Sequence, residues 1–127
     1  MPSTKYAVLR DGPFGKRYYS IIYAIEAADL ALIKFGRTNN IEKRFKSLVG
    51  ASPNRLTLLG HIWMPDGTEA YLHQHLQDER SHGEWFYAEP PCRLVAELIA
   101  KGMHRELLDE IGLNFLIRDS DTKRGAA

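Results

Sequence analysis

Apolar and polar residues alternate in the first third of the chain in a pattern that predicts a β-hairpin. The runs SIIYAI and LALIKFG are apolar and β-branched, and the residues AADL between them suit a four-residue turn. If Glu26 pairs with Ala31 across that turn, Tyr23 falls directly opposite Lys34, with Cβ atoms about 5 Å apart. The pattern therefore predicts a phenol beside an ammonium group on one face of the hairpin.

A helical pattern follows the hairpin. Gly36 ends the second strand, and Asn39 or Asn40 is a suitable N-cap for a helix. That helix carries an apolar stripe at positions i, i+4 and i+7, made of Ile41, Phe45 and Leu48. Arg44 borders the stripe, so we expect its side chain to lean toward the sheet.

The rest of the chain predicts two further strands, a short extended piece and three more helices. The expected elements, in order, are a strand over 5–10 ahead of a turn over 11–15, a buried strand over 56–64, a helix capped by Thr68 or Asp66, a short extended piece over 84–87, a helix from Pro90 and a short helix over 103–111. Residues 119–127 are polar, which is typical of a disordered tail.

Composition limits the class of protein. The chain has 127 residues, of which 44% are hydrophobic and 26% charged, as expected for one globular domain with a modest core. No apolar run approaches the roughly 20 residues of a membrane helix, and the N-terminus lacks the apolar segment of a secretory signal. The single cysteine, Cys92, excludes an internal disulfide, so we expect a cytoplasmic protein.

The net charge of +1 gives little sign of a nucleic-acid partner, but the charge distribution does. Six basic residues and one acidic residue, Glu42, lie in the stretch around the first helix. The basic residues are Lys34, Arg37, Lys43, Arg44, Lys46 and Arg55. This excess fits either a phosphate-facing patch or an ordinary solvated helix face.

A glutamate begins the second predicted helix. Glu69 shares a helix face with Leu72 and His73, so its carboxylate should point into the fold. The ordinary alternative is that Glu69 only compensates the helix dipole. A zinc site built from His73, His75 and His82 is disfavoured, because no cysteine is near and the first two lie on different helix faces.

Taken together, these segments resemble the GIY-YIG nucleases, over roughly residues 17–101. The matching segments are Ile21-Ile22-Tyr23, Lys34-Phe35-Gly36, Glu69-Ala70-Tyr71-Leu72-His73 and Gly83-Glu84-Trp85-Phe86. The resemblance is closest to the small phage and restriction branch, which has KIG in place of YIG. Glu84 stands near a position where many members carry an asparagine close to the metal.

The resemblance implies a fold of the α/β (α+β) class, a three-stranded antiparallel sheet flanked by helices. An extra N-terminal strand and an extra C-terminal helix would lie outside that core. The whole would form a single domain over residues 1–118. For partners, the resemblance implies DNA and no membrane, with a homodimer or a specificity partner supplying sequence preference.

The resemblance also implies a Mg²⁺-dependent endonuclease, with Mn²⁺ as a substitute, that leaves a 5′-phosphate and a 3′-hydroxyl. Glu69 would hold the metal and Arg44 would bind the scissile phosphate. Tyr23 would act as general base, with Lys34 lowering the pKa of its phenol. Supporting roles would fall to His73, Tyr19 and Glu84, and nucleic-acid contacts to Arg37, Lys43, Lys46 and Arg55.

Alternatives remain open at this point. Tyr19 shares the parity of Tyr23 and is a rival for the general base, although the eleven-residue spacing to Lys34 favours Tyr23. Trp85 either seals the core or stacks on a nucleobase. The chain as a whole could instead be a non-cutting nucleic-acid-binding module, or a protein-interaction domain that uses its C-terminal helix.

Overall fold

The computed structural model describes residues 6–113, which form a six-stranded antiparallel sheet and four α-helices. The predicted tail over 119–127 lies outside the described residues. The strands are β1 (Val8–Gly12), β2 (Gly15–Ala27), β3 (Leu32–Thr38), β4 (Thr57–Pro65), β5 (Arg80–His82) and β6 (Trp85–Tyr87). The helices are α1 (Ile41–Ala51), α2 (Thr68–His75), α3 (Pro90–Ala100) and α4 (His104–Glu110).

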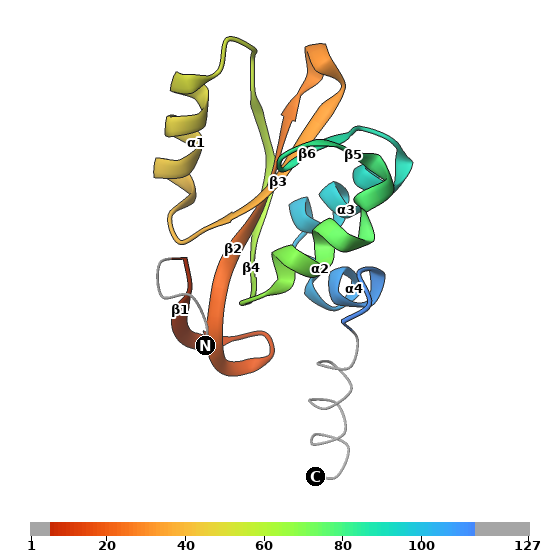
Figure 1. The fold of residues 1–127 in the computed structure, drawn as a ribbon. Helices are drawn as coiled ribbons and strands as arrows, with labels where there is room; N and C mark the ends of the chain where they lie inside the picture. The colour runs from red at the N-terminus through yellow and green to blue at the C-terminus, as the bar shows by residue number, and fades with distance from the viewer. Residues whose placement is uncertain (1–5, 114–127) are drawn as a thin grey trace.

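Strand β2 is the centre of the sheet (Figure 1). Its residues pair with β4 along one edge, and Tyr19 pairs with both Val8 of β1 and Pro65 of β4. Because a strand has two edges, β1 and β3 must lie end to end along the other edge of β2. Beyond β3, strands β6 and β5 complete the sheet.

The two faces of the sheet are covered differently. Figure 1 shows α2, α3 and α4 on one side of the sheet and α1 alone on the other. The main core lies under α2–α4, where alternate strand residues meet helix residues, among them Ile22, Phe35, Met64, Leu72, Val95, Ile99 and Leu107. Helix α1 contributes no buried residue, so its apolar stripe packs only partly against the sheet.

The α+β class is confirmed, but the predicted three-stranded sheet is too small. The expected N-terminal strand is β1, and the short aromatic piece is β6, which pairs with β3 through Lys34 and Trp85. Strand β5 then pairs with β6. These additions cover the first part of an edge of β3, from Leu32 to Lys34, that would otherwise expose unpaired backbone groups.

The predicted pairing of Tyr23 with Lys34 is wrong. The four-residue loop lies one residue later than expected, over 28–31, and Ala31 adopts a left-handed conformation with φ of 53°. Tyr23 therefore pairs with Gly36. The shift is two residues along β3, an even number, so Lys34 stays on the same face as Tyr23.

The helix boundaries follow the predicted signals with small differences. Asn40, one of the two candidates, is the N-cap of α1, and its side chain accepts a hydrogen bond from the Lys43 backbone N–H. The expected short helix near the C-terminal end is α4. Within residues 6–113, no helix has the length and apolar character needed to cross a membrane.

Candidate functional site

The site is built around the ring of Tyr23, at a point where the sheet provides room for it. Tyr23 is 1% exposed, and its hydroxyl lies directly over Gly36 of β3. A Cβ at Gly36 would come within 2.3 Å of the Tyr23 hydroxyl oxygen, so only glycine leaves space for the phenol. In the segment Lys34-Phe35-Gly36, the glycine is therefore important as well as the lysine, because it leaves room for the Tyr23 ring.

The site lies at an open part of the β3 edge. Pairing of β3 with β6 runs from Leu32 to Lys34 and then stops. At the next residue, the Phe35 N–H donates to the Glu84 carbonyl at 3.1 Å, and its carbonyl oxygen lies 2.7 Å from Nε2 of His73. Side chains from both faces of the sheet can therefore meet at this edge.

Lys34 does not occupy the position that the sequence predicted. Its Nζ lies 3.6 Å from a carboxylate oxygen of Glu84 and 5.4 Å from the ring centroid of Trp85. The charges acting on the Tyr23 phenol are those of Glu84, Arg44 and Glu69. Lys34 is thus a partner of the acidic group and does not activate the phenol as expected.

The pKa of Tyr23 lies well above its usual range. Burial is the main cause, and the nearby carboxylates of Glu84 and Glu69 raise the pKa further, while the Arg44 guanidinium lowers it. The phenol is therefore neutral at physiological pH in the metal-free protein. This is the opposite of the shift that the sequence predicted.

Glu69 projects from the first turn of α2 into this site, as expected. Burial and the neighbouring carboxyl of Glu84 raise the pKa of Glu69 to about 7, although Arg37 lies close enough to oppose this. The Nε of Arg37 is 3.8 Å from Oε1 of Glu69, and its Nη1 is 3.5 Å from Oδ1 of Asp66. The other carboxylate oxygen of Glu69 is buried and has no hydrogen-bond partner among the described residues.

Glu69, Glu84 and His73 together form a group that fits a divalent cation. One ligand atom from each lies within 4.8 Å of the others. If Nε2 of His73 donates to the Phe35 carbonyl, its Nδ1 carries the free lone pair, as in many metal-binding histidines. Two hard carboxylates with an orphaned, buried oxygen suit Mg²⁺ or Mn²⁺.

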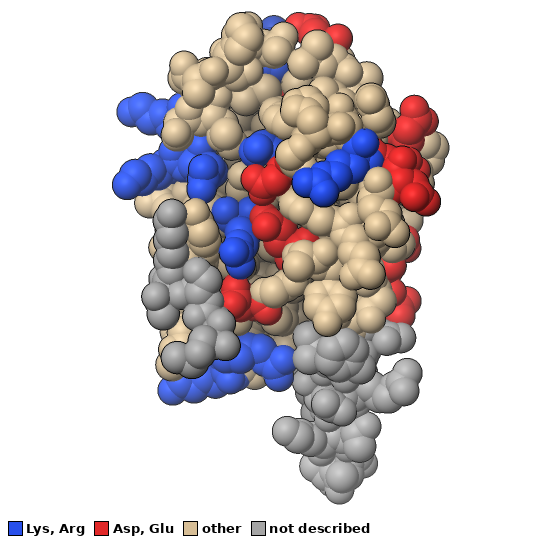
Figure 2. All heavy atoms as spheres, in the orientation of Figure 1, with Lys and Arg blue, Asp and Glu red and all other residues tan. Residues whose placement is uncertain are grey.

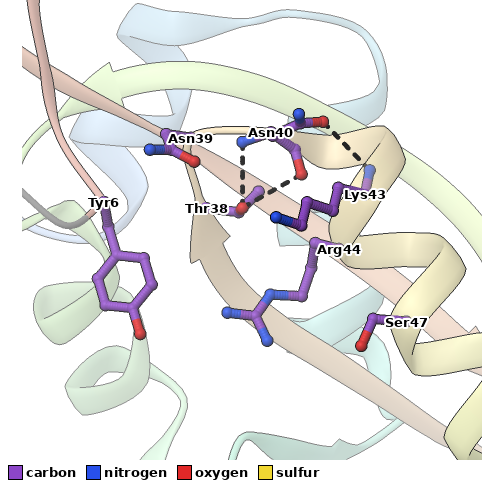
Figure 3. Close-up of a pocket in the computed structure, with 7 residues that line it drawn as sticks. All are labelled: Tyr6, Thr38, Asn39, Asn40, Lys43, Arg44 and Ser47. Carbon is purple, nitrogen blue, oxygen red and sulfur yellow. Dashed lines mark hydrogen bonds between the residues drawn. The ribbon is translucent and has the colours of Figure 1, made fainter.

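Arg44 approaches the site from α1 beside a hollow of about 270 Å³ (Figure 3). The hollow is lined by Tyr6, Thr38, Asn39, Asn40, Lys43, Arg44 and Ser47. Its described lining contains two cations and no acid, and it opens at the N-terminal end of a helix. Both features favour an anionic group such as a phosphate.

Tyr19 is not a second candidate for proton transfer. Its hydroxyl donates to the Gly15 carbonyl at 2.6 Å and accepts from the Phe14 N–H at 3.1 Å. The side chain is fully buried and fastens the β1–β2 turn. Tyr19 is separated from Tyr23 by an even number of residues, as predicted. Its hydroxyl, however, already donates one hydrogen bond to the backbone and accepts another from it.

The structure divides the residues predicted to contact nucleic acid. Arg37 belongs to the centre of the site, where it contacts Asp66 and Glu69. Lys43 lines the hollow beside Arg44, while Lys46 and Arg55 are exposed outside it. Figure 2 shows a basic surface over α1, the helix that carries both of these lysines, with acidic surface beside it.

Two residues of the site were missed by the sequence analysis. Asp66 precedes α2 in a turn and was considered only as a helix cap, yet it pairs with Arg37. Tyr6 comes from the segment before β1, and the Arg37 guanidinium lies 5.1 Å from its ring centroid. Neither residue lies in a recognisable motif. Each contacts Arg37 only in the folded protein, because both are far from Arg37 in the sequence.

Comparisons with known proteins place the chain in a family. The model of the T5orf172 domain matches residues 18–108, well over half of the chain, including the whole of the site except Tyr6. The comparisons with curated proteins and with solved structures returned no match. The expected extra helix α4 falls largely inside the matched region, whereas β1 lies outside it.

The assignment to the GIY-YIG nucleases is wrong, since the matching family model is that of the T5orf172 domain. The resemblance rested on short segments of a hairpin and two neighbouring elements, and short motifs of this kind are not specific to one family. The T5orf172 domain is associated with nucleases and DNA binding, which supports a nucleic-acid-related function. The chain belongs to the T5orf172 domain family.

Proposed function

We propose that this protein is a Mg²⁺-dependent endonuclease that hydrolyses phosphodiester bonds in DNA. The observation that carries the proposal is the convergence of a phenol, a guanidinium and a pair of partly buried carboxyl groups at the open edge of β3. Tyr23, Arg44, Glu69 and Glu84 are close enough for the charges of the last three to act on the phenol. The family supports DNA as the partner.

Arg44 is the proposed phosphate ligand. It faces the hollow beside the site, and its planar guanidinium matches two oxygens of a phosphodiester. Lys43 in the same lining adds a second positive charge. Arg37 is less suited to this role, because Asp66 and Glu69 already engage it.

Glu69, with Glu84 and His73, would hold the cation. A bound Mg²⁺ would supply positive charge that stabilises the charge developing on the phosphate. The unpartnered oxygen of Glu69 and the repulsion between the two carboxyls are the features that fit this role. Lys34 offsets part of the negative charge of Glu84 when no cation is bound.

Tyr23 is the proposed proton acceptor. A water molecule attacks phosphorus and passes its proton to the phenolate oxygen. The bond from phosphorus to the 3′-oxygen breaks, and the 3′-oxygen takes up a proton from solvent water to leave as a hydroxyl. The high pKa of the phenol arises partly from Glu84 and Glu69, so neutralising these carboxylates favours the phenolate. Deprotonation of Tyr23 is therefore tied to occupation of the acidic group.

The test is cleavage of a labelled DNA duplex with and without Mg²⁺. Tyr23→Phe should lose about 10²- to 10⁴-fold in rate, as expected for a proton-transfer residue. Glu69→Gln should lose the response to Mg²⁺. Tyr87→Phe and Glu106→Gln change exposed side chains that are not among the residues of this group, and they serve as matched controls. Full activity of either Tyr23→Phe or Glu69→Gln would refute the assigned role.

One observation favours a second function, a nucleic-acid-binding module that does not cut. The Tyr23 phenol is neutral in the metal-free site, so it could serve only as a hydrogen-bond donor to a phosphate. That function predicts binding that is independent of Mg²⁺, with no products at any metal concentration. Binding and cleavage measured on the same preparation distinguish the two.

A further inference from the structure

Most of the β1–β2 hairpin lies ahead of the region that the family model matches. The family match begins at residue 18, so β1, the turn and the first residues of β2 lie ahead of it. In Figure 2, blue surface covers this hairpin at the bottom of the view, while a second basic area covers α1 and acidic surface lies between them. The hairpin thus places positive charge at the opposite end of the candidate site from α1.

Two arginines of the hairpin lie opposite each other without a carboxylate partner among the described residues. Arg10 and Arg17 are directly opposite each other in the register of β1 and β2. Like charges directly opposite each other destabilise a sheet. Among residues 6–113, neither guanidinium pairs with a carboxylate, although Arg10 lies 4.5 Å from the ring centroid of Trp63. An anion between the two would relieve their repulsion.

Arg10 and Arg17 point to the same side of the sheet as the candidate base. Arg17 and Tyr23 are six residues apart on β2, and side chains at even spacing share a face. The contact of Arg10 with Trp63 agrees with this, because Trp63 pairs with Ile21 on that face. At about 3.3 Å per residue, the arginine pair lies roughly 20 Å along the strand from Tyr23.

The hairpin is held rigidly at that position. The Tyr19 hydroxyl bonds to the backbone of both Phe14, in the turn, and Gly15, the first residue of β2. Phe14 is buried, and its ring makes an edge contact with His104 of α4, with centroids 6.3 Å apart. The arginines are therefore carried by a strand pair that is anchored to the core at its tip.

We propose that Arg10 and Arg17 bind the phosphate backbone of a DNA duplex whose scissile phosphate lies at Tyr23. This inference rests on the proposed function and adds the form of the substrate. A separation of roughly 20 Å corresponds to about six base pairs at 3.4 Å per step, and a duplex is stiff enough to run straight over that length. A single strand bound at Tyr23 is flexible, so its further phosphates would not be held near Arg10 and Arg17.

The experiment measures the salt dependence of binding to a 20-base-pair duplex in the absence of divalent metal, so that no strand is cut. The double variant Arg10→Gln/Arg17→Gln is compared with the natural protein. Lys16→Gln is the matched control, because Lys16 lies on the same hairpin but on the opposite face. Circular dichroism and thermal melting establish that each variant is folded.

Each phosphate contact contributes about 0.9 to the slope of log affinity against log salt. The double variant should therefore show a slope smaller by about 1.8, which means about tenfold less affinity lost between 50 and 200 mM salt. Lys16→Gln should leave the slope unchanged. On a single strand of the same length, the double variant and the natural protein should have the same slope.

The outcomes separate the two proposals. If the natural protein cuts duplex DNA with Mg²⁺ but the folded double variant has an unchanged salt slope, the hairpin proposal fails and the proposed function stands. An equal change of slope on single strands overturns the assignment to duplex DNA. If the natural protein neither binds nor cuts DNA, the proposed function fails and the hairpin proposal fails with it.

Discussion

The two faces of the sheet differ in how completely they are covered. Helices α2, α3 and α4 bury one face with side chains such as Leu72, Ile99 and Leu107, each 0% exposed. The other face has only α1, which contains no buried residue. Even so, the strand residues beneath α1 include Tyr23 and Ile25, which are themselves buried.

The face covered by α2–α4 contains most of the core that stabilises the fold, whereas the face covered by α1 contains several residues of the proposed chemistry. The helix-covered face supplies Glu69 and His73, whose positions are fixed by the packing of α2 against the core. The α1 face supplies Tyr23, Lys34 and Arg44, beside a hollow that remains open. The Glu69 carboxyl thus lies on the helix-covered face, and the hollow proposed to bind a phosphate lies on the face that α1 covers only partly.

The largest expected effect is on stability, from truncation of the core on the helix-covered face. Ile99→Ala should lower the free energy of unfolding by about 2–5 kcal/mol, because it removes buried methyl groups and leaves a cavity. Leu48→Ala on the half-covered α1 should cost only about 1 kcal/mol. Urea unfolding of both variants measures this. Equal losses would contradict the proposed difference between the faces.

Two glycines offer a paired test, one on each face. In Gly36→Ala, the new Cβ would lie 2.3 Å from the Tyr23 hydroxyl oxygen, so the phenol must move and cleavage should fall about 100-fold. In Gly60→Ala, the Cβ would lie 2.5 Å from the Ala100 backbone and should cost about 1–3 kcal/mol of stability.

The folded fraction of Gly60→Ala should retain normal cleavage, because its strain lies between β4 and α3. Cleavage rates corrected for folded fraction, together with thermal melting, give both quantities. A Gly36→Ala variant that cuts normally would show that the position of the phenol does not matter.

Glu69→Gln should stabilise the metal-free protein at pH 8 by about 1–3 kcal/mol. The pKa of Glu69 is raised from 4.5 to about 7 in the folded state, so the folded protein holds more protons than the unfolded chain between those values. The contribution of Glu69 to the free energy of unfolding is therefore fully present below pH 4.5 and is lost as the pH rises to about 7.

Urea unfolding at pH 8 and at pH 4.5 measures this prediction, and the stabilisation by glutamine should shrink at the lower pH. Glu106→Gln, at an exposed position, is the control. A Glu69→Gln variant that is less stable at pH 8 would mean that the carboxylate is structural and not a group held ready for a cation.

The smallest expected effect concerns the ion pair between Glu26 of β2 and Arg93 of α3, which are 2.6 Å apart. Arg93 is half exposed, so Arg93→Ala should cost less than about 1 kcal/mol. The loss should be smaller still in 1 M salt. A loss comparable to that of Ile99→Ala would show that this face depends on charge as much as on apolar packing.

Much of the secondary structure could be predicted from the sequence because it depends on local periodicity. The hairpin of β2 and β3, the cap at Asn40 and the strand β4 follow from alternation and capping signals. The register was missed by two residues, since the loop used Ala31 in a left-handed conformation, which no local signal indicates. The shared face of Tyr23 and Lys34 survived, because an even shift preserves parity.

The partners within the site could not be predicted in the same way. Whether Lys34 meets a phenol or a carboxylate depends on β6 pairing beside β3, which brings Glu84 next to it. The inclusion of Asp66 and Tyr6 depends on the ends of β4 and β1 lying along β2. Such contacts join residues tens of positions apart, and a short sequence window contains no information about them.

The sequence by itself indicated most of the candidate residues and which face of its own strand or helix each one occupies. Periodicity fixes these properties through backbone geometry that extends over only a few residues. The tertiary structure alone decided the direction of the Tyr23 pKa shift, because burial and neighbouring carboxylates, which come from distant segments, set the energy of a charge.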